Sequence, residues 1–564
     1  MKIRLIIFFT LASFAITSGQ NFPKDYFSAP LDIPMYLSGN FGELRSNHYH
    51  SGIDIKTQGR EGHKVYATAS GVVSRIKVSP YGYGHAIYID HPNGYTTVYG
   101  HLQRFSAKID KIVKHYQYSQ ESFAIDEMLA SDILKVKKGE VIGFSGNSGS
   151  SGGPHLHFEI RETESEYPTN PLLYGFDIHD DVAPVIRGLY IYPLDETAVV
   201  DGSNDKKLYR LTKIGNTYSL QNAKVPLVSG KIGFALDTRD YMNGTRNYYG
   251  IYQLDMYVDE QLEHSFTFDK FSFSESRYLN AHIDYALYKT HKRRIHKLFH
   301  EDNHKESFTE VFNKGIYFKD KQQHSVRIDI ADVSGNKIDL KFNVQAAVQK
   351  ETPNLGGPLL SYYMPNRLEI ENFYVKIPAL TFYKDIPKKE IQAIPSERKD
   401  SYSKQYHFLD ETVPLHKNIT VGIRPNDIPH HLHDKAFIAR KNGSKYRFAG
   451  HNWDGKYLTA KTNAVGDFVV LVDTIAPQIS LWRGSSFKKT GKLRYKITDN
   501  LSGIASFKGK IDGKWVLFEY DPKLNIIWHI LSPEVITKVQ KHKLELEVKD
   551  SCGNIGFREA YFTW

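Results

Sequence analysis

The chain has 564 residues, of which 41% are hydrophobic and 24% are charged. This length exceeds what one ordinary hydrophobic core supports, and at roughly 150 residues per domain it predicts about three or four modules. The composition is that of a folded, soluble protein rather than a disordered one. The formal charge of +10 would suit an anionic partner, although solubility explains a basic balance equally well.

The first 19 residues have the features of an export signal. Lys2 and Arg4 give a positive start, residues 5–17 form a short apolar run, and residues 17–19 offer a cleavage site. The run is too short to span a bilayer comfortably, and an uncleaved N-terminal anchor is the alternative. No later stretch is apolar enough to cross a membrane. We therefore expect a signal peptide at residues 1–19, no stable membrane span after its cleavage, and an exported protein in the periplasm or the extracellular cell envelope.

Cysteine and aromatic content narrow the class further. Cys552 is the single cysteine, so no intramolecular disulfide can form. A large β core does not need disulfides, and an exported chain with one thiol fits a bacterial envelope better than a eukaryotic secretory setting. The 37 tyrosines and 32 phenylalanines favour strands, so we predict a mainly β chain.

The region from residue 20 to residue 180 is rich in glycine and in short alternating runs. Residues 85–90 and 95–99 read as strands joined by a turn, which predicts a hairpin. Residues 65–69 and 71–78 look like a second strand pair. The apolar spacing of residues 106–134 predicts one or two helices inserted between strands.

The rest of the chain contains a repeated pattern. Residues 181–184 (Asp-Val-Ala-Pro) and 473–479 (Asp-Thr-Ile-Ala-Pro-Gln-Ile) are similar, and each is followed at a distance by a strand that ends in a Gly-Asn turn. Matching openings and closings predict two related β-sandwich, Ig-like modules. The predicted parts after the first domain are a β-sandwich at 183–346, a linker at 351–358, a strand-rich module of unknown role at 360–470, and a β-sandwich at 474–564.

Three short segments of the first domain contain histidines that are candidates for a functional site. They are residues 48–54, 99–102 and 146–160. His155 and His157 should project from one face of a strand, about 7 Å apart. If that face is buried, the two imidazoles need hydrogen-bond partners or a metal ion. His50 and Asp54 are four residues apart, which places them on one side of a helix or a strand, and the Ser-Gly pair between them argues against a helix.

Zinc suits this set of residues best. It accepts imidazole nitrogen and carboxylate oxygen in tetrahedral geometry, and a catalytic site keeps one position open for water. One cysteine excludes a thiolate site, and the absence of a His-Glu-x-x-His helix excludes a thermolysin-type peptidase.

Read together, His50-x-x-x-Asp54 and His155-x-His157 resemble the paired signature of the M23 peptidases, the lysostaphin/LytM group. Further short segments around this signature also resemble the family's sequences, at residues 39–42, 53–55, 67–71, 82–84, 101–102 and 138–143. The resemblance covers residues 38 to 175, about a quarter of the chain. It implies a compact antiparallel β domain with a groove over a zinc ion, acting on peptide bonds in bacterial cell-wall peptides.

By position, the resemblance implies that His50, Asp54 and His157 are the zinc ligands and that His101 and His155 line the open metal position as catalytic residues. Zinc lowers the pKa of bound water toward 7, and histidines with an ordinary pKa near 6.5 suit proton transfer or oxyanion stabilisation. No carboxylate base stands beside the metal phrases, so a histidine base is expected, with the roles of the two histidines left undivided.

Two departures from the family pattern stand out. His85 occupies a position where relatives often carry asparagine, and the insertion at residues 106–134 is long enough to cover or reshape the groove. We expect His85 and His48 to be structural or to line the groove rather than to bind metal.

Two other groups of histidines are not expected to bind a metal ion. Residues 428–434 resemble a metal cluster in composition, but a solvated turn is the better interpretation. Residues 291–300 read as a charge run on an amphipathic or edge segment rather than a ligand set, and nucleic-acid binding is not expected of an exported protein.

The leading hypothesis is an exported zinc metalloendopeptidase that cuts peptidoglycan stem peptides or cross-links. One alternative is a catalytically silent LytM-like wall-binding protein that activates another cell-wall hydrolase. A second alternative is an adhesion or scaffold protein in which the β-sandwich modules carry the function and the peptidase domain is a remnant. The oligomeric state is not predicted.

Overall fold

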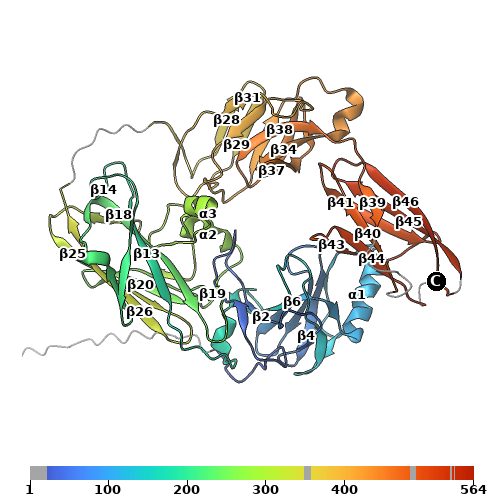
Figure 1. Cartoon of the computed structure of the whole chain (residues 1–564), viewed down its shortest axis with the longest axis horizontal. Helices are drawn as coiled ribbons and strands as arrows, with labels where there is room; N and C mark the ends of the chain where they lie inside the picture. Colours follow the sequence, from blue (N-terminus) through green and yellow to red (C-terminus); the bar gives the residue numbers. More distant parts are fainter. Residues whose placement is uncertain (1–21, 349–356, 483–490, 534–535, 539) are drawn as a thin grey trace, which may run out of the picture.

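The computed structural model describes residues 22–348, 357–482, 491–533, 536–538 and 540–564. The predicted signal peptide and most of the predicted linker lie outside these residues. The chain is mainly β, as predicted, and its strands gather into four lobes that follow one another around a ring (Figure 1). Within the described part of the chain, none of the helices combines the length and apolar character needed to cross a bilayer.

The first lobe holds the histidine phrases. Its elements are β1 (Leu37–Gly39), β2 (Ile53–Lys56), β3 (Lys64–Tyr66), β4 (Gly71–Val78), β5 (His85–Asp90), β6 (Tyr95–Leu102), β7 (Arg104–Phe105), α1 (Ala107–Ser119), β8 (Ile125–Met128), β9 (Lys135–Val136), β10 (Val141–Phe144), β11 (His155–Glu162), β12 (Pro168–Thr169) and the 3-10 helix η1 (Pro171–Tyr174). The main sheet has the order β1-β2-β11-β6-β5-β4-β8, and β3, β10 and β7 form a second sheet.

The hairpin predicted at residues 85–99 is confirmed as β5 and β6, which pair antiparallel. The second predicted pair is wrong, because β3 pairs with β10, while β4 pairs with β5, β8 and β9. The reason is that the chain after β3 bonds to a distant segment: the amide of Gly139 donates to the Ala67 carbonyl at 2.8 Å and the amide of Ala67 donates to the Glu140 carbonyl at 2.9 Å. Sequence proximity does not reveal that partner.

The insertion between β7 and β9 contains one helix, α1, followed by strand β8, which extends the main sheet beside β4. Ile109 and Val113 lie one helical turn apart and are buried in the core of the lobe. The helix is therefore anchored to the main core, and its opposite face is directed outward.

The second lobe surrounds the long strand β18. Its elements are β13 (Val185–Pro193), β14 (Val199–Val200), β15 (Lys207–Tyr209), β16 (Leu211–Ile214), β17 (Thr217–Leu220), η2 (Gln221–Ala223), β18 (Leu227–Tyr241), β19 (Tyr248–Tyr249), β20 (Gln253–Val258), β21 (Gln261–Thr267), η3 (Ser276–Tyr278), α2 (Leu279–His282), α3 (Tyr285–His291), β22 (His296–Lys297), β23 (Thr309–Val311), β24 (Ile316–Phe318), β25 (Gln323–Ala331) and β26 (Lys337–Ala346). Phe41, Leu44 and Tyr49 of the first lobe belong to its hydrophobic core, so the two lobes share buried packing.

The third lobe contains two five-stranded antiparallel sheets and a two-stranded one, and the fourth contains two four-stranded antiparallel sheets; each lobe has its own main hydrophobic core. The third has β27 (Leu359–Leu360), β28 (Asn366–Ile370), β29 (Phe373–Ile377), β30 (Ile386–Pro387), β31 (Gln392–Ile394), β32 (Gln405–Phe408), β33 (Ile419–Ile423), η4 (His430–Lys435), β34 (Ala436–Asn442), β35 (Lys445–Gly450), β36 (Asn452–Asp454), β37 (Tyr457–Thr462) and β38 (Gly466–Val472). The fourth has β39 (Gln478–Leu481), β40 (Lys492–Thr498), β41 (Ile504–Ile511), β42 (Lys514–Trp515), β43 (Glu519–Asp521), β44 (Ile526–Ile530), β45 (Lys541–Asp550) and β46 (Ile555–Thr563).

The repeated phrases occupy equivalent places in lobes two and four. In lobe two, the Asn336 side chain donates to Asp332 at 2.8 Å and to the Asp180 carbonyl at 3.2 Å. In lobe four, Asn554 donates to Asp550 at 2.7 Å and to the Asp473 carbonyl at 2.8 Å. The same hydrogen bonds tie the opening phrase to the closing turn in both lobes.

The ring closes where lobe four meets lobe one, beside α1 (Figure 1). The rings of Tyr118 and Trp515 meet edge to face, with centroids 5.1 Å apart. The Lys523 ammonium donates to the carbonyl of Asn147 and, at 3.3 Å, to that of Ser151. The inserted helix thus faces the last lobe, and Lys523 contacts the glycine-serine loop before β11.

Candidate metal centre

Two neighbouring strands bring the predicted ligands together. Asp54 on β2 and His157 on β11 are directly opposed partners in the antiparallel pairing. His50 lies just before β2, where its amide and carbonyl bond to the segment of Glu43 and Gly42. A Cβ atom at Gly52 would stand 2.3 Å from the Phe158 carbonyl oxygen, so only glycine permits this close approach.

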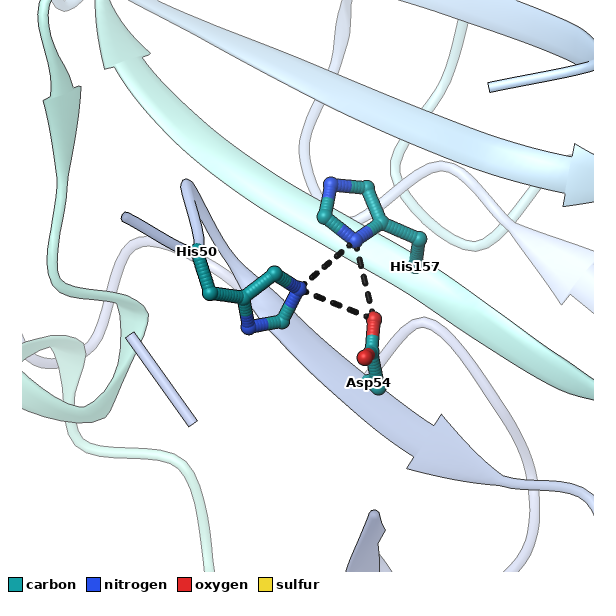
Figure 2. A group of neighbouring side chains, drawn as sticks. All are labelled: His50, Asp54 and His157. Carbon is teal, nitrogen blue, oxygen red and sulfur yellow. Dashed lines mark hydrogen bonds and ion pairs between the residues drawn. The ribbon is translucent and has the colours of Figure 1, made fainter. Parts of the chain in front are cut away.

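The three side chains converge on one point (Figure 2). His50 Nε2 is 3.1 Å from Asp54 Oδ1 and 3.1 Å from His157 Nδ1, and His157 Nδ1 is 2.9 Å from Asp54 Oδ1. Ligand atoms bound tetrahedrally to zinc at about 2.0–2.1 Å lie about 3.3 Å apart. The donor atoms are therefore the right types at close to the right separations for one zinc ion.

Outer hydrogen bonds leave the converging atoms free to bind a cation. His50 Nδ1 donates to the Asn40 carbonyl at 2.7 Å, and His157 Nε2 donates to Glu159 Oε1 at 2.7 Å. The guanidinium of Arg45 donates to Asp54 Oδ2 at 2.8 Å and leaves Oδ1 on the ligand side. This arrangement fixes the tautomer of each imidazole, as metal-binding histidines require.

The electrostatics of the metal-free cluster point the same way. Burial lowers the pKa of His50. Burial opposes ionisation of Asp54, yet the charge of His50 and hydrogen bonds from His155 and His157 hold its pKa well below the usual range. Burial also acts to lower the pKa of His157, but hydrogen bonds and charge interactions with Asp54 and Glu159 outweigh burial and raise this pKa to about 9. The charge of the buried Asp54 carboxylate is thus compensated from several sides, by Arg45 and by the surrounding imidazoles.

Glu159 is a site residue that sequence reasoning missed. Its fully buried carboxylate accepts hydrogen bonds at Oε1 from Ser51, Tyr83 and His157, and at Oε2 from Arg161 at 2.6 Å. Its position two residues after His157 on one strand face could have indicated it. Because both oxygens are engaged and the side chain is fully buried, Glu159 orients His157 and is not available as a base.

His101 and His155 stand side by side next to the cluster, with ring centroids 4.8 Å apart. His101 has φ +59° at the irregular end of the β5–β6 pairing, which turns its side chain toward the site. Its Nδ1 donates to the Ser148 carbonyl at 2.9 Å, and His155 Nδ1 donates to the Gly153 carbonyl at 2.8 Å. Nε2 of His101 is left without a proton in the neutral ring, and His155 Nε2 lies 3.4 Å from Asp54 Oδ1, within ion-pair distance of that carboxylate.

His101 is poised as a neutral imidazole. Burial, followed by the nearby charges of His157 and His155, lowers its pKa to about 3. Its Nε2 therefore carries no proton throughout the neutral pH range.

A groove of about 810 Å³ lies over the cluster. Lobe one contributes residues of the histidine phrases and of the glycine-serine loop, and lobe two contributes Phe273, Ser276, Arg277 and Arg294. The insertion at 106–134, all of which the structure describes, supplies none of the lining residues. The groove is open, and the predicted alternative that the insertion covers it is not what the structure shows.

The other histidines take several positions. His48 lines the groove and His85 Nε2 lies 3.5 Å from Glu519 of lobe four. His430 is exposed on the 3-10 helix η4. Residues 291–300, predicted as an amphipathic or edge segment, have an exposed start and a buried end: His296 and His300 are buried because β22 pairs with β18 and enters the core of lobe two.

Nitrogen and oxygen donors converging at an open groove form the kind of centre that metal-dependent hydrolases use. Comparison with known families agrees with this class. Residues 48–118 and 111–171 match the model of peptidase family M23, and residues 358–473 match that of the Zu5-like domain. The first lobe is therefore a peptidase domain of family M23, of the lysostaphin/LytM type.

Several relatives and solved structures are similar to this domain. The DD-carboxypeptidase/endopeptidase Mpg of Neisseria meningitidis serogroup B is 37% identical over 129 residues, which cover 23% of each chain. The peptidoglycan DD-endopeptidase ShyA of Vibrio cholerae is 30% identical over 149 residues, covering 25% of this chain and 29% of the relative. A mutant catalytic domain of the prophage-encoded M23 protein EnpA from Enterococcus faecalis is 26% identical, with 28% of this chain and 99% of that chain covered and a TM-score of 0.20.

The similarity to Mpg and ShyA is confined to the peptidase domain. The chain spans less than a third of the length of these curated relatives. These two relatives therefore bear on only about a quarter of this chain.

Proposed function

We propose that this chain is an exported zinc endopeptidase that hydrolyses peptide bonds in peptidoglycan stem peptides or cross-links. The observation that carries the proposal is the convergence of His50, Asp54 and His157 within 3.1 Å of one another at the floor of an open groove. The names of Mpg and ShyA as peptidoglycan endopeptidases support the same substrate class.

Each residue has a definite task in this proposal. His50 Nε2, Asp54 Oδ1 and His157 Nδ1 would hold the ion, which when bound acidifies water and polarises a carbonyl group. His101 and His155 direct their Nε2 atoms toward the same space, fixed in direction by the Ser148 and Gly153 carbonyls. One Nε2 accepts the proton of the attacking water and delivers it to the leaving amine, while the other orients water or substrate.

The groove also carries positive charge that suits an anionic peptide. Arg45, Arg277 and Arg294 line it, and Nε of Arg294 is buried without a hydrogen-bond partner among the described residues. Arginine forms bidentate hydrogen bonds with carboxylates. We therefore propose that free carboxylates of the wall peptide contact Arg277 and Arg294, which the second lobe supplies to the groove.

Digestion of purified sacculi tests this function. We expect the wild-type protein to release new peptide fragments, identified by mass spectrometry, and His155→Ala to release none while retaining metal. If the wild type binds zinc and wall but releases fragments only when a second hydrolase is present, the activator hypothesis replaces the enzyme.

The export signal at residues 1–19 and the module boundaries 20–180, 183–346, 360–470 and 474–564 are part of the proposal. N-terminal sequencing of the protein recovered from the envelope checks the signal. Detection of an N-terminus at Met1 in the mature protein would contradict it.

A further inference from the structure

A second group of metal-binding side chains lies inside lobe two. His282 ends α2, and His304 and Glu306 lie on the segment between β22 and β23. Their side chains are 2%, 1% and 0% exposed, respectively. Two imidazoles and one carboxylate so deeply buried require either a charge partner or a metal ion.

The geometry of this group repeats that of the groove cluster. His282 Nδ1 and His304 Nε2 each lie 3.1 Å from the same oxygen of Glu306, Oε2. The candidate ligand atoms all lie within 4.8 Å of one another. Since zinc-bound ligand atoms are about 3.3 Å apart, these separations need little adjustment to accept an ion.

Hydrogen bonds on the far side of His282 and Glu306 orient these side chains as they would need to be to bind an ion. His282 Nε2 lies 2.8 Å from His296 Nδ1, so the ring can donate its outer N–H to His296 and turn Nδ1 toward the ion. The second carboxylate oxygen of Glu306, Oε1, accepts a hydrogen bond from the Tyr49 hydroxyl. Ligating histidines and carboxylates are oriented in this way in metalloproteins.

Unsatisfied nitrogens provide an independent observation. Nδ1 of His304 makes no hydrogen bond among the described residues, and Nε2, 3.1 Å from Glu306 Oε2, makes only an ion-pair contact that is not aligned as a hydrogen bond. Both ring nitrogens of His264 and Nε2 of His300 are also buried without partners. Buried polar groups are nearly always paired, and a metal ion would satisfy the nitrogen of His304 directed at Glu306.

We propose that His282, His304 and Glu306 bind a second zinc ion, which has a structural role. All three side chains are buried in lobe two and none of them lines the groove, so the site offers no path for a peptide. A closed site of this kind stabilises the fold to which its ligands belong.

The ion would fasten lobe two to the metal-binding segment of lobe one. Tyr49, between His48 and His50, donates through its hydroxyl to Glu306 and through its amide to Ser276 Oγ at 3.0 Å. The side chain of Tyr49 is thus held by Glu306 of lobe two, while its neighbour His50 faces the groove. The second ion therefore fixes the backbone that positions a ligand of the first.

Metal analysis of purified protein tests the inference separately from the proposed function. We expect two zinc ions per wild-type chain, one in Asp54→Ala, one in His304→Ala and none in the double variant. Glu306→Gln preserves side-chain volume and should also hold one ion, with a lower thermal midpoint that added zinc does not restore. His291→Ala, an exposed histidine on α3, is the matched control and should keep both ions.

Anomalous diffraction at the zinc edge needs no variant. A peak within bonding distance of His282, His304 and Glu306 in wild-type crystals is the expected result. One ion per wild-type chain, lost in Asp54→Ala and retained in His304→Ala, would overturn the second site and leave the groove site standing. That outcome would mean that Glu306 is neutralised by a protonated histidine.

Discussion

His157 Nε2 lies 2.7 Å from Oε1 of Glu159, a carboxylate two residues further along the same strand. Glu159 is buried completely, and Arg161 compensates its charge from the other side at 2.6 Å. The pair sets the ring so that Nδ1 faces Asp54 and His50. An imidazole held in this way is a stronger ligand than a freely rotating one.

Glu159→Gln should weaken zinc binding without removing a ligand. The amide cannot accept from Ser51, Tyr83 and His157 while also pairing with Arg161, so the orientation of His157 is lost. We expect the zinc dissociation constant to rise about 10- to 100-fold. Competition with a chromogenic chelator measures it, with exposed Glu164→Gln as the control. Equal zinc affinity in Glu159→Gln and Glu164→Gln would show that Glu159 does not support metal binding.

Metal binding and cleavage should separate in a pair of variants. Asp54→Ala removes a ligand and should lose the groove ion together with activity. His155→Ala should retain that ion and lose roughly 10²- to 10⁴-fold in turnover, because only proton transfer or orientation is removed. Zinc content and peptide release are measured on the same preparations. Loss of the groove ion from His155→Ala would show that this histidine is a ligand instead.

Asp240 should make the stability of lobe two depend on pH. Burial, with the nearby charges of Asp332 and Asp180, raises the pKa of this carboxyl group from 3.8 to about 9. A raised pKa in the folded state means that stability is fully present below pH 4 and is lost as the pH rises toward 9.

Relative to Asp240→Asn, which stays neutral, the wild type should lose up to about 1.4 kcal/mol of unfolding free energy per pH unit between pH 5 and 8. Urea unfolding of both proteins in buffer free of divalent cations measures the difference. Parallel pH profiles would show that Asp240 does not carry a raised pKa.

Lys523 should influence the groove from lobe four. Its ammonium donates to the Asn147 and Ser151 carbonyls, on the loop whose Ser148 and Gly153 carbonyls hold His101 and His155. Lys523→Ala should lower kcat/KM by about 2- to 10-fold, the effect of one or two exposed hydrogen bonds. Exposed Lys496→Ala on β40 is the control. Unchanged kinetics in Lys523→Ala would mean that the last lobe does not brace the loop.

Local patterns predicted much of lobe one. The hairpin of β5 and β6, the helix in the insertion and the common face of His155 and His157 follow from turn residues and apolar periodicity over a few positions. The pairing of β3 with β10 could not be predicted this way, because the partner strand lies about 75 residues further along the chain and leaves no local signal.

Contacts between lobes were equally invisible in the sequence. Arg277 and Arg294 reach the groove from lobe two, and Trp515 packs on Tyr118 from lobe four. The pattern at residues 291–300 predicted an amphipathic or edge segment, but it did not reveal that His296 and His300 lie on the buried side. Amphipathic spacing predicts that one side is buried but does not say which polar residues accompany the apolar ones.

The central claim is that one zinc ion held by His50, Asp54 and His157 enables peptide cleavage in this groove. Release of new amino termini from a defined cross-linked muropeptide by zinc-stripped protein, before and after zinc is returned, tests it most directly. We predict that zinc restores cleavage to the wild type and not to Asp54→Ala or His157→Ala. Equal cleavage by a folded Asp54→Ala protein shown to lack the groove ion would contradict the claim.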